Sequence, residues 1–498
     1  MNYYLGVDIG TTSVKAVAFS EQGKVVANFS FSYAIHHPRP NWSEQDPDEI
    51  FEAVIKGINK VVQTLATDVL KFVSFSAAMH SLIAADDKGN LLTQCIIWAD
   101  NRADEIADTL RNSDKGQKFY NVSGVPIHAM SPLCKLLWFK ENQPEIFNTA
   151  FKFIGIKEYI FYKLFGEYFI DTSIASATGL LNLKTLQWDE EILNYTGITA
   201  SRLSQVVSVK HILHYNGNYP GLSLPQNIPF VIGASDGALA NLGTGATGSN
   251  AMAITVGTSG AARVVIAAPE TDNLMRTFCY HLKDNLYIAG GATNNGAVVL
   301  QWLKETLLQT NDNYEQLYEQ AQTIEAGCEG LLFLPYILGE RAPLWNSNAK
   351  GVYFGLTIEH TKAHLIRAAM EGVIFSLYSI GEILTENKEI TEIHASGGFT
   401  KSTLWLQILA DVFNIKALVP PAVESTAFGA VILGAEALSL KTDFQNQTSA
   451  AYIPISKHHE IYTKCFEKFE KLYILLKGEM VHEAPTLKGA ESPITSAL

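Results

Sequence analysis

Two glycine-containing turns, one in each half of the 498-residue chain, constrain the fold more than any other feature of the sequence. In the first, an apolar run leads into Gly10-Thr11-Thr12-Ser13, and a second strand-like stretch follows at once. In the second, Ala253–Val256 leads into Gly257-Thr258-Ser259-Gly260, again with a strand-like stretch behind it. Glycine lets a backbone approach an anion closely, and consecutive N–H groups and hydroxyls donate to its oxygens. The pair predicts a cleft that holds one nucleotide from both sides.

The two turns differ in charge at one position. Asp8 precedes the first turn, whereas Thr255 occupies the corresponding place before the second. A carboxylate has the wrong sign to bind phosphate, so Asp8 is predicted to hold a bridging Mg²⁺, through water. The predicted phosphate-binding residues are Gly10, Thr11, Thr12, Ser13, Lys15, Gly257, Thr258 and Ser259. The alternative is two unrelated hairpins, because a Gly-Thr turn is common.

Composition narrows the class of protein. A hydrophobic content of 47% with 17% charged residues is typical of a well-buried globular enzyme. The formal net charge of −13 speaks against nucleic acid or an anionic membrane as a partner. The sequence shows no membrane-length apolar run and no basic-then-apolar leader. Its five scattered cysteines lack Cys-x-x-Cys spacing, which predicts reduced thiols in a cytoplasmic protein without a zinc site.

Alternating strand and helix patterns favour an α/β architecture in two domains. We expect a meander of strands over 1–35, then a helix that Asp46 caps and Pro47 begins. The expected domains are 1–244, with the substrate, metal and phosphate contacts, and 245–498, which binds the nucleotide. In the second domain we expect helices near 295–309, 361–385 and 402–413 and a strand at 391–395. Beyond about residue 455 we expect an amphipathic helix and then a disordered tail.

Asp236 is the best candidate for a catalytic residue. A buried strand at 230–235 runs into a turn that presents this one carboxylate at the junction of the halves. Phosphoryl transfer from ATP to an alcohol requires a carboxylate within hydrogen-bond reach of the attacking hydroxyl, with Mg²⁺ on the phosphates. We therefore predict that Asp236 is the general base and lies with Asp8 at the metal. Taken alone, an Asp before a Gly is more typical of a turn former.

Other polar clusters suit the two substrates of such a reaction. Met79-His80 and Asp100-Asn101-Arg102 follow strand-like stretches in the first half, where they could contact a polyhydroxylated molecule. Gly397-Gly398 could lie against a base, and the segment from Gly296 to Gln301 against a ribose or base edge. The alternatives are a structural His80, a plain strand-to-helix connection and a helix cap. Residues 339–346 are interpreted as a stiff loop with an internal Glu340–Arg341 ion pair.

These residues together resemble the FGGY family of carbohydrate kinases over nearly the whole chain. Two long spaced patterns, at 130–142 and 351–372, carry the resemblance. It implies two ribonuclease-H-like domains of the actin and sugar-kinase type with a deep interdomain cleft. It also implies Asp236 as the base, Asp8 on Mg²⁺, both turns on the phosphates of ATP, and Gly398 with Ser402 near adenosine. The implied substrate residues are Met79, His80, Asp100, Arg102, Met130 and Asp236.

Within the family, segments 76–81, 98–102, 155–160 and 339–346 look most like gluconokinases. The resemblance implies phosphorylation of D-gluconate at its terminal hydroxyl to 6-phosphogluconate; the alternative is a xylulokinase or another pentulose or polyol kinase. Met79-His80 stand where glycerol-specific relatives have Arg-Glu, and Gly237 stands where some relatives have a polar residue. A gluconate carboxylate requires a cation or a helix N-terminus, and Arg102, His80 or Lys157 could supply it.

A third hypothesis is an actin- or chaperone-like ATPase that acts on no sugar. Under the two kinase hypotheses the expected binding partner is a small sugar acid or sugar. A homodimer is compatible with the sequence.

Overall fold

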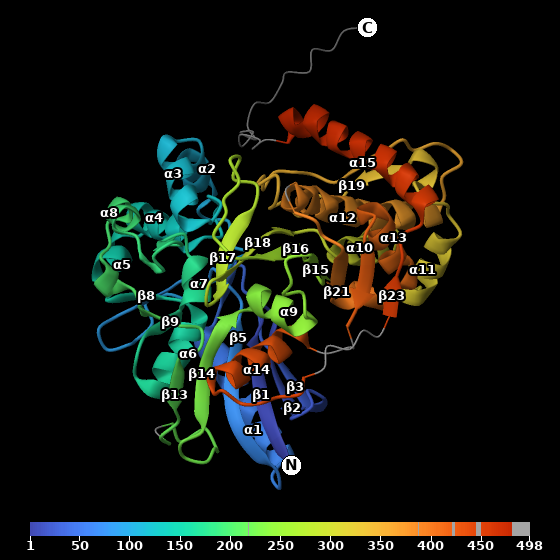
Figure 1. The fold of residues 1–498 in the computed structure, drawn as a ribbon. Helices are drawn as coiled ribbons and strands as arrows, with labels where there is room; N and C mark the ends of the chain where they lie inside the picture. Colours follow the sequence, from blue (N-terminus) through green and yellow to red (C-terminus); the bar gives the residue numbers. More distant parts are fainter. Residues whose placement is uncertain (218, 387, 421–423, 445–449, 481–498) are drawn as a thin grey trace.

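The computed structural model describes residues 1–498 except 218, 387, 421–423, 445–449 and 481–498. Two mixed sheets, each flanked by helices, form its two halves (Figure 1). This two-domain α/β fold confirms the predicted fold class. The tail expected to be disordered falls at 481–498, outside the described residues.

The first sheet has the strand order β13-β14-β5-β1-β2-β3. Its strands are β1 (Asn2–Ile9), β2 (Ser13–Ser20), β3 (Val25–Ser32), β5 (Val69–Ala77), β13 (Ile212–His214) and β14 (Pro229–Ser235). β1 pairs antiparallel with β2 and parallel with β5, so the first glycine turn closes the expected hairpin between two interior strands of the sheet. Helix α1 (Pro47–Thr64) covers this sheet, and the Asp46 carboxylate accepts hydrogen bonds from its first turn as predicted.

The second sheet has the order β17-β18-β16-β15-β21-β22-β23. Its strands are β15 (Ala251–Val256), β16 (Gly260–Ile266), β17 (Phe278–Lys283), β18 (Leu286–Thr293), β21 (Glu392–Ser396), β22 (Lys416–Val419) and β23 (Ala450–Tyr452). β15 pairs antiparallel with β16 and parallel with β21, which repeats the arrangement around β1. Its helices include α10 (Val298–Trp302), α11 (Tyr314–Gln322), α12 (Lys362–Thr385), α13 (Thr403–Phe413) and α15 (Ser456–Leu476).

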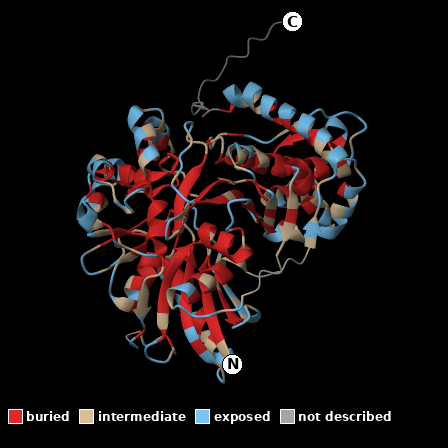
Figure 2. Cartoon of the chain, viewed as in Figure 1, coloured by how far each residue is buried: buried red, intermediate tan, exposed pale blue. Residues whose placement is uncertain are grey.

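Helix α12 shows why the second half has a large core. Most of it is buried against β16, β18 and the short strand β19 (Leu332–Leu334) (Figure 2). By length and composition alone α12 could cross a membrane, but 72% of its most apolar window is buried inside the fold. Its apolar character on all sides is therefore that of a core helix.

Two helices lie where the halves meet. α9 (Asp236–Thr244) follows β14, and α14 (Ser425–Ala437) packs against α9, β1 and β5 although it comes from the end of the chain (Figure 1). The contact is close because glycines face backbone: a Cβ on Gly243 would lie 1.8 Å from the Ser425 carbonyl oxygen. A Cβ on Gly429 would similarly lie 2.0 Å from that of Leu239. The boundary expected at 244–245 stays a prediction.

Three expected elements differ in detail. The strand-like stretch before Asp100 forms only the short strand β7 (Cys95–Ile96). The helix expected near 295–309 begins at Val298 and ends in a π-helical turn at Leu303–Leu307. Asp236 lies not in a turn but at the first position of α9. The reason is Ser235, whose hydroxyl accepts a hydrogen bond from the Ala238 backbone N–H and so starts the helix one residue after the strand.

Candidate active site

Asp236 lies at the junction of β14 and α9, as the first residue of the helix. A helix N-terminus favours a carboxylate, and the Gly237 backbone N–H donates to Asp236 Oδ1 at 2.6 Å. Burial and the charge of Asp8 nevertheless raise the pKa of Asp236 to about 6, while Arg263 and Arg341 act in the opposite direction. A carboxylate with a pKa this close to neutrality is suited to accept a proton from an alcohol.

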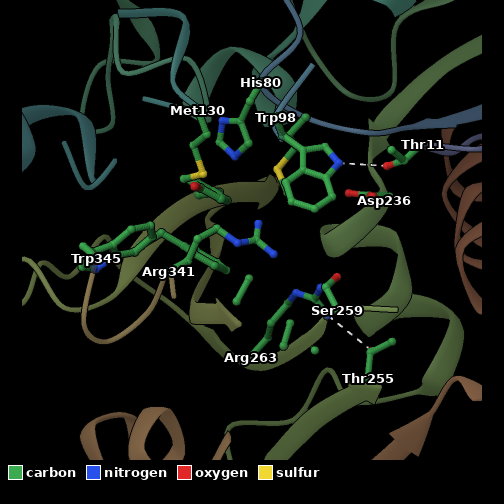
Figure 3. Close-up of a pocket in the computed structure, with 16 residues that line it drawn as sticks. Thr11, His80, Trp98, Met130, Asp236, Thr255, Ser259, Arg263, Arg341 and Trp345 are labelled. Carbon is green, nitrogen blue, oxygen red and sulfur yellow. Dashed lines mark hydrogen bonds between the residues drawn. The ribbon is translucent and has the colours of Figure 1, made fainter. Parts of the chain in front are cut away.

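Asp236 faces a cavity of about 150 Å³, here called the central cavity, to which both halves contribute (Figure 3). Thr11 of the first glycine turn and Ser259 of the second line the same cavity. The carboxylate and both turns therefore meet, as the sequence predicts. The other lining residues are Met79, His80, Trp98, Met130, Thr255, Gly260, Ala261, Arg263, Phe278, Tyr280, Ala292, Arg341 and Trp345.

Met79, His80 and Met130 all reach the central cavity. The Nδ1 atom of His80 lies 2.8 Å from the Ala177 carbonyl oxygen. Burial, followed by the charges of Lys135 and Arg341, lowers the pKa of His80 to about 3. The ring is therefore neutral near pH 7, so His80 can hydrogen-bond a hydroxyl but cannot supply a positive charge.

Lys135 is a positioning residue that the sequence did not single out. It is fully buried, and its ammonium donates to the carbonyl oxygens of His80 at 2.6 Å, Ile97 at 2.8 Å and Ile96 at 3.2 Å. One side chain on α4 (Pro132–Asn142) thus joins the two segments that carry the expected substrate residues.

Asp100 and Arg102 are not among the residues that line the central cavity. Arg102 pairs with Asp100 at 2.8 Å and Glu44 at 2.5 Å, and its guanidinium lies 3.7 Å from the Trp42 ring centroid. This buried cluster holds the segment that carries Trp98, whose indole N–H donates to Thr11 Oγ1 at 2.9 Å. Its arrangement supports a positioning role in place of the expected substrate contact.

Lys157 is likewise engaged away from the cavity, in a 2.6 Å ion pair with Asp171. None of the three residues that the sequence suggested for reading a carboxylate therefore offers a free cation.

The expected Glu340–Arg341 ion pair is wrong, because no ion pair joins these two described side chains. The Glu340 carboxylate instead accepts hydrogen bonds from Thr293 Oγ1, the Asn294 and Arg341 backbone N–H groups, Asn295 Nδ2 and Ser376 Oγ. Arg341 is left to extend into the central cavity (Figure 3). Sequence reasoning also missed Arg263, whose only signal was its place on the strand after the second turn.

The predicted metal residues fit a divalent cation. Asp8 is buried, its Oδ2 accepts a hydrogen bond from Thr426 Oγ1 at 2.8 Å, and its Oδ1 has no partner. Burial, together with the charge of Glu424, raises the pKa of Asp8, and the charge of Asp8 in turn raises the pKa of Asp236. Among the described residues no group of three His, Cys, Asp or Glu forms a metal cage. Mg²⁺ commonly takes one or two carboxylates plus water and phosphate, which matches this sparse set.

The two turns leave room for an anion. Gly10 N–H donates to the Ser13 carbonyl at 3.0 Å, and Gly257 N–H to that of Ser259 at 2.9 Å, so each turn is closed tightly. Thr12 and Thr258 are exposed at the tips, and a Cβ on Gly257 would meet no atom within 4 Å. Lys15 makes a 2.7 Å ion pair with Glu424, so its predicted phosphate contact requires that pair to open.

A second cavity of about 560 Å³, here called the side cavity, lies in the second half between α10, α11 and α13. Thr258, Gln301 and Gly398 line it, together with the apolar Phe399, Tyr318 and Trp405. Thr258 therefore connects the second turn to a pocket that could hold a base.

Of the residues expected near the ribose and base, Ser402 and Gly296 do not line the side cavity. Ser402 instead caps α13, where its hydroxyl accepts from the Trp405 backbone N–H at 3.2 Å. Gly296 packs on the second turn, and a Cβ there would lie 2.6 Å from the Gly257 carbonyl oxygen. Both residues shape the surroundings of the site.

Comparison with known proteins gives the same picture. Residues 3–243 match the N-terminal domain and residues 252–438 the C-terminal domain of the FGGY family of carbohydrate kinases. A gluconokinase of Bacillus licheniformis is 43% identical over 99% of both chains, and one of Bacillus subtilis (strain 168) is 46% identical over 87% of each. A xylulose kinase of Staphylococcus epidermidis is 30% identical over 94% of this chain and 96% of its own.

Solved structures are equally similar in fold. A gluconate kinase from Lactobacillus acidophilus superimposes with a TM-score of 0.91 at 37% identity, over 95% of this chain and 98% of its own. A ligand-bound xylulose kinase from the same organism gives 0.92 at 36% identity, over 96% and 99%. Fold likeness alone therefore does not distinguish the two sugars.

Proposed function

The chain belongs to the FGGY family of carbohydrate kinases, and we propose that it phosphorylates the terminal hydroxyl of D-gluconate with ATP to give 6-phosphogluconate. The observation that carries a kinase activity is the shared lining of the central cavity, where Asp236 meets both glycine turns. Sequence identity of 43–46% to gluconokinases, against 30% to a xylulose kinase, favours gluconate as the acceptor.

In the proposed reaction Asp236 accepts the proton of the attacking hydroxyl, and its raised pKa makes it basic enough to do so near neutral pH. The N–H groups of the two turns donate to the phosphates, with Thr258 linking them to the side cavity for the base. Asp8, with its unpartnered Oδ1, would hold Mg²⁺ through water. When bound, the metal would neutralise charge on the phosphates.

Residues of the first half, with Tyr280 of the second, orient the sugar acid. Met79 and Met130 provide apolar surface for its carbons, and the neutral His80 and the buried, unpartnered Tyr280 hydroxyl provide hydrogen bonds for its hydroxyls. Closure of the two halves would keep water from the γ-phosphoryl group. A cytoplasmic location and a homodimer stay predictions.

A coupled ADP-release assay on D-gluconate, D-xylulose, D-ribulose and glycerol tests the proposal. We expect the highest kcat/KM on D-gluconate and negligible ADP release without an acceptor. A higher kcat/KM on xylulose or ribulose would favour a pentulose kinase, and rapid ADP release without any sugar would favour the ATPase hypothesis.

A further inference from the structure

The central cavity contains two arginines, Arg263 and Arg341, to which the proposed reaction gives no role. We propose that Arg341 binds the carboxylate of the substrate and so selects sugar acids over neutral sugars. This inference rests on the proposed function, which requires an anionic acceptor.

The lining of the central cavity carries a surplus of positive charge. Its described lining residues include two guanidiniums and one carboxylate, that of Asp236, while His80 is neutral. Arg341 is 8% exposed. A buried charge without a partner is costly, and a bound anion would offset that cost. A neutral ketose would leave Arg341 without an ion-pair partner, since no carboxylate of the described residues is paired with it.

The two arginines lie in different parts of the cavity. Arg263 lies against the reacting end of the site, because a Cβ on Gly237 would be 3.2 Å from its Nε. Gly237 follows Asp236 directly and so leaves the space that Arg263 occupies. Arg263 is therefore suited to balance the charge of Asp236. Its Nη1 reaches Thr255 Oγ1 at 3.4 Å.

Some hydrogen-bond donors of the Arg341 guanidinium have no protein partner. Its Nη2 donates to the Thr293 carbonyl oxygen at 3.2 Å, and its Nε is buried without a partner, as is that of Arg263, so the two arginines differ in their place in the cavity. Its guanidinium lies 4.5 Å from the Trp98 ring centroid. In Figure 3 it extends into the cavity from the side of Met130 and Trp345, with Asp236 on the opposite side. The carboxylate of an extended sugar acid lies at the end of the molecule remote from the reacting hydroxyl, which matches this separation.

Backbone hydrogen bonds hold the segment around Arg341 in place. The Ala342 backbone N–H donates to the Ala292 carbonyl on β18 at 3.0 Å, and Glu340 and Asn346 exchange backbone hydrogen bonds of 2.8 and 2.9 Å. Because Glu340 is satisfied by other donors, it does not draw the Arg341 guanidinium away. A planar guanidinium held this way can make two parallel hydrogen bonds to a carboxylate.

The test compares D-gluconate with D-gluconamide, which has the same carbon chain and hydroxyls but no charge. We expect Arg341→Gln to lower kcat/KM for gluconate about 100-fold, mainly through KM, and to change it less than about threefold for gluconamide. Arg341→Lys keeps the charge without the fork and should lose about tenfold on gluconate. The exposed Arg39→Gln is the matched control and should leave both substrates unchanged.

Equal losses on both substrates in Arg341→Gln would overturn the inference, because a structural role lowers both alike. The wild-type enzyme keeps the test decisive if that variant does not fold: equal kcat/KM for gluconate and gluconamide would also overturn it. Failure of the proposed function is seen separately, as preference of the wild-type enzyme for a pentulose.

Discussion

The β1–β2 hairpin of the first half and the β15–β16 hairpin of the second have the same strand arrangement. They differ in charge at the position two residues before the glycine of the turn. Asp8 lies opposite Lys15 across its hairpin and opposite Ser76 on the parallel strand β5. Thr255 lies opposite Ala261 and, on the parallel strand β21, opposite Ser396. One backbone arrangement therefore presents a carboxylate in one half and a hydroxyl in the other.

The side chains of Asp8 and Thr255 also differ in their hydrogen-bond partners. Thr255 Oγ1 and Ser396 Oγ share a 3.0 Å hydrogen bond, so the second hairpin has a local partner for its hydroxyl. Asp8 has one oxygen held by Thr426 and one without a partner. A buried carboxylate oxygen without a donor is costly, and a cation offsets that cost. In the proposed reaction both backbone turns bind phosphate, and only the first hairpin adds a charge, the one proposed to hold Mg²⁺.

Asp236→Asn should have the largest effect, because it removes the base while keeping the shape of the side chain. We expect kcat to fall at least about 1000-fold, with the Kd for ATP within about threefold of wild type. Single-turnover kinetics and equilibrium nucleotide binding measure the two quantities. Near wild-type turnover would remove Asp236 from the role of base.

Asp8→Asn and Thr255→Val test the comparison directly. We expect Asp8→Asn to lower kcat about 100-fold and to raise the Mg²⁺ concentration needed for half-maximal rate. Thr255→Val, which loses only a hydroxyl, should change kcat less than about threefold. Titration of Mg²⁺ at saturating ATP and gluconate measures both variants. Equal losses would mean that the charge at this position is not what distinguishes the hairpins.

The elements that the sequence predicted well are those whose signals are local. Both hairpins, the Asp46 cap of α1 and the buried strand before Asp236 follow from turn chemistry and short patterns. The site residues that it missed depend on distant partners. Glu340 is the sequence neighbour of Arg341, but its carboxylate is taken by Thr293 and by Asn295, which lie 47 and 45 residues away.

The direction in which a side chain points could not be predicted from the sequence either. Trp98 and Arg102 follow the same short strand, yet Trp98 lines the central cavity and Arg102 turns back to Glu44. Nothing in the local pattern distinguishes them, because the direction depends on Trp42 and Glu44 from another segment. The surroundings of a glycine are equally hard to predict. Gly257 and Gly296 were both predicted to contact the nucleotide, but Gly257 faces open space and Gly296 faces backbone atoms.

Gly257→Ala and Gly296→Ala should therefore have opposite consequences. A Cβ on Gly257 meets no protein atom, so the fold should keep its melting temperature while the methyl group occupies phosphate space and raises KM for ATP about tenfold. A Cβ on Gly296 would press on the Gly257 carbonyl oxygen and should cost about 1–3 kcal/mol of stability. Thermal unfolding and ATP kinetics separate them. A destabilised Gly257→Ala with unchanged KM would contradict a phosphate contact.

Thr426→Ala should give the smallest effect and tests whether the last part of the chain supports the metal-directed hairpin. The variant removes the 2.8 Å hydrogen bond to Asp8 Oδ2, so the carboxylate loses a donor and some of its fixed orientation. We expect the half-saturating Mg²⁺ concentration to rise about fivefold, since one hydrogen bond to a charged group contributes a modest free energy. Ser425→Ala is the neighbouring control. Because α14 crosses to the first sheet to place Thr426 there, no change in the Mg²⁺ requirement would mean that α14 contributes only packing to this half.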